Sequence, residues 1–427
     1  MINKIETPKT VAIYVHWPFC LSLCPYCDFN SHVRENINYM HWQSSLIKEL
    51  KHYAKFTGKR IVKSIFFGGG TPSLMPPSIV DKIINEIEKL FYIDKNIEIT
   101  LEANPTSAES YKFKEFSRAG INRVSLGVQA LNDDALNFLG RNHSLLEAEK
   151  AIDIIGSTFA RYSFDLIYNR PNQSIDMWVS ELQKAIKMAK NHLSVYQLTI
   201  EPGTPFYLLL ARGALKLPDE GTSASLYEIT QEVLSDVGMD AYEISNHASY
   251  GEACRHNLVY WQYGDYIGIG PGAHGRITIN GAIYATRQHR APEIWLSRVE
   301  ENGHATQTHQ ALDTNSIINE MIMMGLRVTE GIDEQNFLNR TGIKLKNAIN
   351  GEVSKRLQEG GFIIHDSNKL LATFSGRQRL DSVISSLLNK ANVYLPGGKL
   401  EIEWPNQAGP VLMQGPALKV FHGQIDI

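Results

Sequence analysis

The sequence predicts an α/β fold, in which a partial TIM-type (β/α)6 barrel is followed by a small C-terminal domain of helical and winged-helix-like character. Up to about residue 290, short apolar runs rich in β-branched residues alternate with amphipathic helical patterns. This alternation predicts a parallel sheet covered by helices, and since no GxGxxG motif opens it, a barrel is favoured over a dinucleotide-binding sheet. The 427 residues, 43% of them hydrophobic, suffice for one large domain and a smaller one.

The barrel strands are expected at six apolar runs, which lie at residues 11–16, 61–67, 97–102, 123–128, 162–167 and 193–200. The pattern after the first run predicts a helix with one apolar face, formed by Leu46, Leu50 and Tyr53. The pattern after the second run predicts a helix with an apolar stripe, formed by Ile79, Ile83, Ile84 and Ile87. Chemistry in such barrels occurs beyond the carboxyl ends of the strands, so polar motifs that follow the strands are the candidate site.

The strand-helix rhythm stops after about residue 290, where helical patterns such as residues 314–326 take over. The segments 357–362 and 369–373 complete a small helical domain with a β-wing. The tail has proline and glycine clusters around a strand-like stretch at 400–404, and we assign it no role. The predicted parts are a barrel at 1–290, a C-terminal domain at 291–390 and a tail at 391–427.

The charge balance points to no polyanionic partner, because 42 Lys and Arg residues against 45 Asp and Glu residues leave a net charge of -3. The first residues lack the apolar run of a secretory signal, and no stretch reaches the roughly 20 apolar residues that a spanning helix needs. We therefore expect a cytoplasmic protein that binds no nucleic acid and has no spanning segment. A peripheral membrane contact and a homodimer stay open.

Three of the four cysteines lie close together in a predicted loop at residues 17–38, as the CxxxCxxC motif of Cys20, Cys24 and Cys27. Thiols this close are better placed to share a metal than to build a disulfide framework, which also indicates a reducing compartment. A cubane cluster has four irons, so three cysteines leave one iron open to a chelating molecule such as S-adenosylmethionine (SAM). The motif therefore predicts an iron–sulfur cluster with an open corner.

Two other interpretations of the cysteines remain. A structural zinc site could be completed by His16 or Cys254, although zinc sites usually contain two CxxC pairs, and the three thiols could be unrelated. Tyr26, inside the motif, could pack on the adenine of a bound cofactor or could only exclude water.

Glycine and polar residues follow the next strands. Gly68, Gly69 and Gly70, followed by Thr71, give a backbone that can lie against a ligand and offer its amides, although such a run can also be a plain turn. Four polar residues lie at or just past the ends of apolar runs, namely Glu102, Gln129, Arg141 and Asp165. Each alone could be a capping or surface residue, but together they would converge on one mouth of a barrel.

Residues 254–276 contain an HNxxYW motif formed by His256, Asn257, Tyr260 and Trp261. An imidazole beside two aromatic rings suits an axial ligand of haem iron. The other interpretation is a buried histidine satisfied by hydrogen bonds, with the aromatic residues as ordinary core. Cys254 could ligate as well, although a lone cysteine is more often a small buried hydrophobe.

These motifs resemble the oxygen-independent coproporphyrinogen III oxidase-like branch of the radical SAM superfamily and, within it, the haem-chaperone group. The likeness runs from about residue 11 to residue 385, and its most specific parts are YVHWPFCxxxCPYCDFNS, FFGGGTPS, NRVSLGVQ, LTIEPGTPF, YEISNHA, HNLVYWQYGDYIGIGPGAH, LRVTEGID and RLDSVI. The resemblance implies a radical SAM-type barrel and a [4Fe-4S] cluster on the three motif cysteines. It implies SAM contacts by Tyr14, Gly69, Gly70, Thr71, Glu102, Gln129, Arg141 and Asp165, and it makes His256 the candidate haem ligand.

The chain departs from this family in two places. Where the family commonly has a GLPGQ-like turn, the chain has Asn169, Arg170, Pro171, Asn172 and Gln173, so the loop after the fifth strand is altered. The tail after Leu387 matches no pattern of the family.

Two main functions follow from the resemblance. The first is a haem chaperone that passes haem to an acceptor protein, and its distinguishing feature is the HNxxYW motif. The second is a coproporphyrinogen III oxidase of porphyrin biosynthesis, which would use a radical from SAM for oxidative decarboxylation. The oxidase class has a further cysteine where this chain has Phe29, and it has a longer region before the strand than the thirteen residues that precede Tyr14, so the chaperone is favoured. A tRNA-modifying radical SAM enzyme ranks last, because the chain is slightly acidic.

Overall fold

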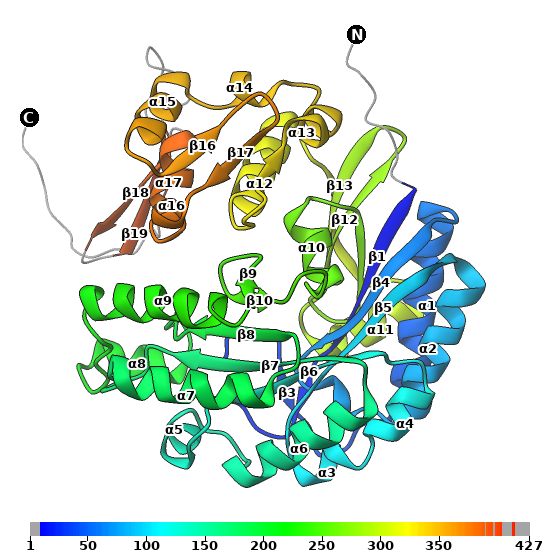
Figure 1. The fold of residues 1–427 in the computed structure, drawn as a ribbon. Coiled ribbons are helices and arrows are strands. Elements are labelled where there is room, and N and C mark those ends of the chain that lie inside the picture. Colours follow the sequence, from blue (N-terminus) through cyan, green and yellow to red (C-terminus); the bar gives the residue numbers. More distant parts are fainter. Residues whose placement is uncertain (1–8, 389, 396–397, 404–411, 415–427) are drawn as a thin grey trace, which may run out of the picture. The chain divides into compact units, whose positions relative to one another are not determined.

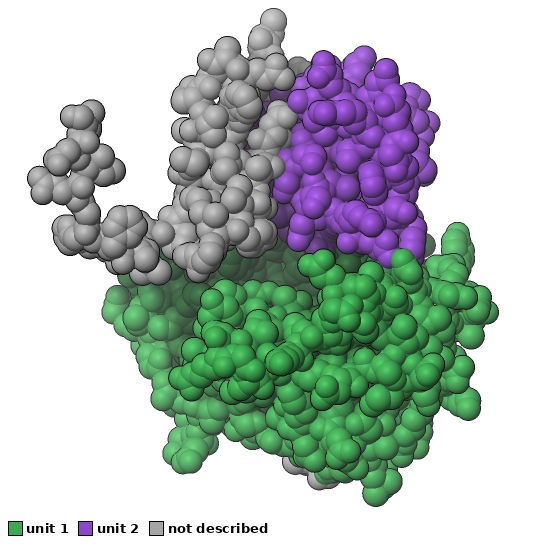
Figure 2. All heavy atoms as spheres, turned by 90° about the vertical axis from the view of Figure 1, so that its left-hand side faces the viewer, with its two compact units in different colours: residues 1, 3–313 green, residues 2, 314–427 purple. Residues whose placement is uncertain are grey.

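The computed structural model describes residues 9–388, 390–395, 398–403 and 412–414 (Figure 1). These residues divide into two compact units on either side of the Asp313–Thr314 bond (Figure 2). The predicted domain limits at residues 290 and 390 stay predictions. Among the described residues, no helix is both long enough and apolar enough to cross a membrane.

A large sheet in the first unit contains six parallel strands in chain order. They are β1 (Thr10–Trp17), β4 (Ile61–Gly69), β5 (Tyr92–Ala103), β6 (Arg123–Gln129), β7 (Arg161–Tyr168) and β8 (His192–Gln197). The first five cover their predicted apolar runs, and β8 matches the sixth run up to Gln197, three residues before its predicted end. Within the described residues the sheet ends at β14 and β9 without closing, so the barrel is partial and the predicted fold class is confirmed.

Further strands extend the sheet at both sides. β11 (Tyr266–Ile269) pairs in parallel with β1, and β12 (His274–Ile279), β13 (Ala282–Gln288) and β14 (Thr306–Ala311) continue it in antiparallel fashion. At the other side lie β10 (Asn246–Ala248) and β9 (Asp240–Ala241). The β12–β13 hairpin turns at Asn280 and Gly281, with φ of 50° and 83°, as expected for the Asn-Gly pair of a tight hairpin.

Helices cover the sheet. The longer ones are α1 (Tyr39–Thr57), α2 (Pro77–Leu90), α6 (Leu145–Thr158), α7 (Ile175–Met188), α9 (Glu220–Ser235) and α11 (Pro292–Asn302). The shorter ones are η1 (Pro72–Leu74), α3 (Ser107–Ser110), α4 (Phe113–Arg118), α5 (Asp133–Phe138), α8 (Pro205–Ala211) and α10 (Arg255–Trp261). The apolar faces predicted for α1 and α2 are buried, as Leu46 of α1 and Ile83 of α2 illustrate, so both helix predictions are confirmed.

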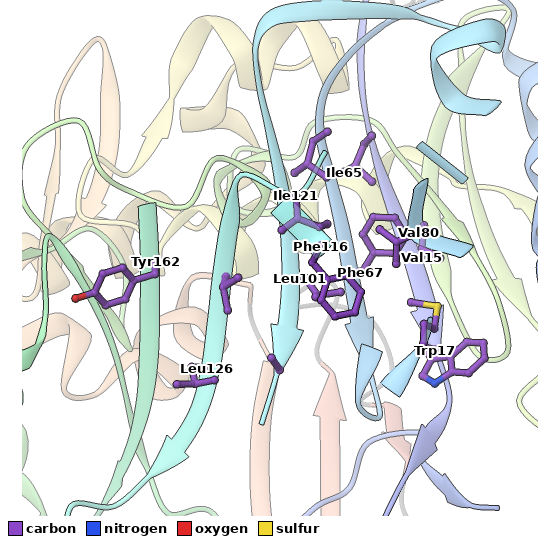
Figure 3. Packing of buried hydrophobic residues seen from close by; sticks show 14 of the residues in the cluster. Val15, Trp17, Ile65, Phe67, Val80, Leu101, Phe116, Ile121, Leu126 and Tyr162 are labelled. Atoms are coloured by element: carbon purple, nitrogen blue, oxygen red, sulfur yellow. The ribbon is translucent and has the colours of Figure 1, made fainter. Parts of the chain in front are cut away.

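The hydrophobic core of this unit lies between the sheet and these helices. Figure 3 shows Phe67 and Leu101, from neighbouring strands, among the core side chains together with Phe116 of α4. All three are fully buried, and each such side chain contributes roughly 1.5–3 kcal/mol through its removal from water. This packing fixes the strands whose carboxyl ends form the cavity described below.

The second unit is smaller and contains both helices and β-sheets. Its helices are α12 (Thr314–Gly325), α13 (Glu334–Thr341), α14 (Leu345–Ala348), α15 (Gly351–Glu359), α16 (Phe374–Arg377) and α17 (Leu380–Leu387). One antiparallel sheet contains β15 (Ile332–Asp333), β17 (Lys369–Ala372) and β16 (Ile363–His365), and another contains β18 (Lys390–Leu395), β19 (Gly398–Glu403) and β20 (Leu412–Gln414). The predicted helix at 314–326 is confirmed by α12, and the predicted strand-like stretch lies in β19 up to residue 403.

A candidate cofactor site at the mouth of the barrel

A cavity of about 470 Å³ opens at the carboxyl ends of the barrel strands in the first unit. The predicted site residues that line it are Cys20, Cys24, Tyr26, Cys27, Gly69, Gly70, Thr71, Glu102, Gln129, Arg141 and Asp165. Two other predicted site residues, Tyr14 and His256, are not part of its lining. The structure therefore brings most of the predicted set together, and the role of each residue stays a prediction.

The three motif cysteines are on the loop that follows β1. Cys20 belongs to the short strand β2 (Phe19–Cys20), which pairs in parallel with β3 (His32–Val33) and so ties the two ends of the loop together. The backbone N–H of Cys27 donates to the carbonyl oxygen of Cys24 at 3.1 Å. The Thr71 hydroxyl donates to Cys20 Sγ at 3.4 Å, and burial raises the thiol pKa of Cys20 and Cys27. A bound metal would reverse that shift, because it favours the thiolate.

The donor set fits an iron–sulfur cluster. No group of three or more His, Cys, Asp or Glu side chains in the described part of the chain converges closely enough for one metal ion. A cubane spreads its cysteine ligands over separate irons and does not need that convergence. His16, one predicted partner for zinc, has both ring nitrogens engaged, with Tyr14 Oη at 3.0 Å and the carbonyl oxygen of Asn30 at 2.9 Å. Cys254, the other, is buried beside Glu98 and does not line the cavity.

The glycine loop forms one wall of the cavity. Gly69 has a φ of 115°, and its N–H donates to Glu102 Oε2 at 3.1 Å. A Cβ at Gly69 would lie 2.6 Å from the His16 ring, and a Cβ at Gly70 would lie 2.8 Å from the carbonyl oxygen of Phe19. Only residues without a side chain fit these two positions, because a Cβ would meet His16 or Phe19 of the chain itself. Both glycines line the cavity.

Two carboxyl groups lie at the strand ends. Burial and the nearby charge of Asp165 raise the pKa of Glu102, at the end of β5, to about 8. Burial raises the pKa of Asp165, on β7, to about 6. Ser125, on the strand between them, donates its hydroxyl to Asp165 Oδ1 at 3.4 Å. A cationic group such as a sulfonium or an ammonium would favour the ionised carboxylates, so this part of the cavity suits a positively charged ligand.

Arg141 connects the cysteine loop with the strand ends. Its Nη1 donates to Cys24 Sγ at 3.1 Å, and its Nη2 donates to the carbonyl oxygen of Gly127 at 2.9 Å and to Asn104 Oδ1. Its Nε is buried and has no hydrogen-bond partner among the described residues. The Arg141 side chain lines the cavity, and a guanidinium suits an anionic group of a ligand such as a carboxylate.

Gln129, at the end of β6, has a φ of 76°, which is rare for a residue with a side chain and is often found at functional sites. The segment after it is fixed, because the N–H of Leu131 donates to Glu181 Oε1 at 2.7 Å. Glu181 in turn forms a buried ion pair with Arg170. The cavity wall at Gln129 therefore depends on a charge pair in a different part of the chain.

Arg170 belongs to the altered loop after β7, which keeps the conformation of a turn. Asn169 and Asn172 stand where the related pattern has glycine, and they have φ of 64° and 59°. Asparagine tolerates this left-handed region better than most residues, so the two exchanges are compatible with the backbone. The Arg170 N–H donates to Gln173 Oε1 at 3.1 Å and closes the loop.

Tyr14 and His256 lie near each other and do not line the cavity. The Tyr14 ring is 6.3 Å from the Phe66 ring and 6.4 Å from the His256 ring, measured between ring centroids. His256 belongs to α10 and is 1% exposed, and burial lowers its pKa to about 3. Burial likewise raises the thiol pKa of Cys254 to about 12, so this cysteine is an inert core residue.

Sequence reasoning missed Asn104 and Tyr196 as parts of the lining. Asn104 is two residues beyond Glu102 in the LEANP motif, and its amide donates to Thr71 Oγ1 at 3.1 Å. Tyr196 is near the carboxyl end of β8, where a polar side chain after an apolar run was a usable signal.

Comparisons with known proteins show what the chain is similar to. The family model described as "Radical SAM superfamily" matches residues 14–206. The family model described as "HemN C-terminal domain" matches residues 312–379. The chain is 36% identical to "Radical S-adenosyl methionine domain-containing protein 1, mitochondrial" of Bos taurus over 90% of this chain and 88% of that protein. It is 34% identical to "Heme chaperone HemW" of Haemophilus influenzae over 89% of this chain and 98% of that protein. The crystal structure of the Escherichia coli coproporphyrinogen III oxidase HemN has a similar fold, with a TM-score of 0.74 at 20% identity over 90% of this chain and 91% of that one.

Proposed function

This chain belongs to the radical SAM superfamily, in the HemN-like family close to the haem chaperone HemW, and on that basis we propose that it is a haem chaperone that carries a [4Fe-4S] cluster with exchangeable SAM. It would bind haem and pass it to an acceptor protein, with a cytoplasmic location. The observation that carries the proposal is the 34% identity to a protein named as a haem chaperone, which extends over nearly the whole length of both chains.

The cavity residues support the cofactor part of the proposal. Cys20, Cys24 and Cys27 would hold the cluster, which supplies an open iron for SAM and a site for one electron. Glu102 and Asp165 would face the positive charges of SAM. These two roles fit the donor chemistry and the raised carboxyl pKa values of the cavity.

The remaining polar groups would orient the same ligand. The Arg141 guanidinium would receive the SAM carboxylate, and the backbone of Gly69 and Gly70 would lie against the amino-acid part. Thr71 and Gln129 line the same wall, and Tyr26 would pack against the adenine. Tyr14 would act from behind the glycine loop, because its ring is within reach of a Cβ at Gly68.

An oxidase function is the second candidate, and one residue disfavours it. Phe29 occupies the position at which the resemblance leads us to expect an additional cysteine in the oxidase class. Phe29 is 65% exposed and lines the cavity mouth, where it adds apolar surface in place of a reactive thiol. The similarity to the oxidase structure, at 20% identity, shows the fold alone.

The test separates the two functions with one preparation. Anaerobically reconstituted protein is mixed with haem and a haem-free acceptor haemoprotein and, separately, with coproporphyrinogen III, SAM and a reductant. We expect haem binding and transfer without formation of the decarboxylated porphyrinogen. Conversion of coproporphyrinogen III with no haem transfer would replace the proposal with the oxidase.

A further inference from the structure

The HNxxYW histidine does not fit the role of an iron ligand in this structure. His256 Nδ1 is 2.9 Å from Ser64 Oγ, and its Nε2 is 2.6 Å from Tyr260 Oη, so both ring nitrogens are engaged. The backbone N–H of His256 also donates to the buried Glu98 at 3.1 Å. An axial ligand of haem needs a free nitrogen lone pair and an open face for the porphyrin. His256 instead holds α10 against β4 and β5.

Another group of histidines in the same unit is accessible. We call it the histidine patch, and it consists of His52 and Phe56 of α1, Tyr284 of β13, His304 before β14, and His309 of β14. The His52 and His304 rings stack with centroids 4.0 Å apart. The His309 ring lies 5.0 Å from the Phe56 ring and 4.8 Å from the Tyr284 ring. The patch is thus a continuous surface of imidazole and aromatic rings.

The imidazoles of the patch are available as ligands. Burial and the neighbouring histidines lower the pKa of His52 to about 4, and burial also lowers the pKa of His304, so both rings are neutral at pH 7. His304 Nδ1 is engaged with Thr306, whereas the described residues provide no hydrogen bond to the ring nitrogens of His52 or His309. His309 is the exposed member, on the edge strand of the sheet.

The arrangement of the rings in the histidine patch favours a metal that is already bound by a planar ligand. The histidines of the patch do not converge on one point, so they do not form a site for a single free ion. Iron porphyrin has four equatorial nitrogens already and needs only one imidazole from the protein. Phe56 and Tyr284 both contact the His309 ring, their own rings lie 6.4 Å apart between centroids, and together they offer apolar and aromatic surface to the porphyrin. Lys55, exposed on α1 close enough to influence His52, offers a cation for a propionate.

We propose that haem docks on the histidine patch with His309 as the axial ligand of the iron, while His256 acts as a structural residue of the barrel. This inference rests on the proposed chaperone function and names the surface that carries the cargo. A shallow, exposed site of this kind suits a carrier, because the acceptor can approach the haem without unfolding of the donor.

The test is a haem titration of the full chain with its cluster reconstituted, followed by the Soret band and by the EPR spectrum of ferric haem. His309→Ala should weaken haem affinity by about tenfold or more and change the EPR signal, because it removes the ligand. His309→Met should keep haem but give a spectrum with a different axial ligand. His365→Ala, a histidine outside the patch, is the control and should match the wild type.

His256→Gln completes the test. We expect a lower melting temperature, because a buried hydrogen-bond pair is disturbed, and an unchanged Soret band in the folded protein. Wild-type spectra for both His309 variants would overturn the assignment of the axial ligand, and loss of the Soret band in folded His256→Gln would overturn the structural role of His256. A wild-type protein that binds no haem would instead contradict the chaperone function itself.

Discussion

The carboxyl pair in the cavity predicts that SAM binding depends on pH. The Glu102 pKa is raised from 4.5 to about 8, by burial first and by Asp165 second, so this side chain is neutral over most of the physiological range in the free protein. A sulfonium cation binds the carboxylate better than the neutral acid. Affinity for SAM should therefore be weak at acidic pH, rise as the pH approaches 8, and level off above it.

The size of the pH effect on SAM affinity follows from the raised pKa of Glu102. With a pKa of about 8, roughly one Glu102 side chain in a hundred is ionised at pH 6 and about half are ionised at pH 8. Each pH unit in this window corresponds to about 1.4 kcal/mol, so a ligand that requires the anion gains up to about tenfold in affinity per unit. Glu102→Gln cannot ionise, so it should bind weakly with a flat profile over this window. Asp165→Asn removes the charge that raises the pKa of Glu102, so the rise in SAM affinity should occur at a lower pH than in the wild type.

Equilibrium dialysis with labelled SAM between pH 6 and pH 9 measures these profiles. Iron content is determined at each pH, so that loss of the cluster is not mistaken for loss of SAM affinity. A wild-type profile that is flat, or that coincides with the profile of Glu102→Gln, would refute the placement of the carboxylate against the cation.

Three further predictions concern other parts of the site. Cys24→Ala should abolish loading of about four irons on anaerobic reconstitution, and undiminished iron would remove this residue from the cluster. Arg141→Lys keeps the charge but loses the geometry of the guanidinium, so SAM affinity should fall while iron content stays near the wild-type level; equal affinity by dialysis would contradict the role of the guanidinium. Arg170→Leu leaves the buried Glu181 unpaired and should destabilise the fold by about 3–5 kcal/mol in chemical denaturation. Combined Arg170→Leu and Glu181→Leu exchanges should recover part of that loss, whereas an unaltered single variant would show that the pair is dispensable.

Much of the barrel could be predicted from periodicity. Strands such as β1 and β4 are apolar along both faces, as the buried strands of a parallel sheet must be, and helices such as α2 carry an apolar stripe. Polar residues at strand ends, such as Glu102, could be expected near one another because parallel strands end at the same side. The hairpin at residues 274–288 was overlooked, although its Asn280–Gly281 turn is a strong hairpin signal.

The features that could not be predicted depend on contacts between distant parts of the chain. A motif does not show which way its side chains point, so nothing in HNxxYW indicated that His256 would meet Ser64, which precedes it by 192 positions. The Arg170–Glu181 pair and its link to Leu131 also arise only when α7 lies against the segment that follows β6. The histidine patch unites residues from α1, β13 and β14, which no local pattern connects.

The most direct measurement for the central claim is the EPR spectrum of the reconstituted, reduced protein with and without SAM. Three cysteine ligands and an open iron predict the signal of a reduced four-iron cluster whose g-values change when SAM occupies the vacant corner. A colourless protein loaded with zinc, or a cluster signal that SAM leaves unaltered, would contradict the account.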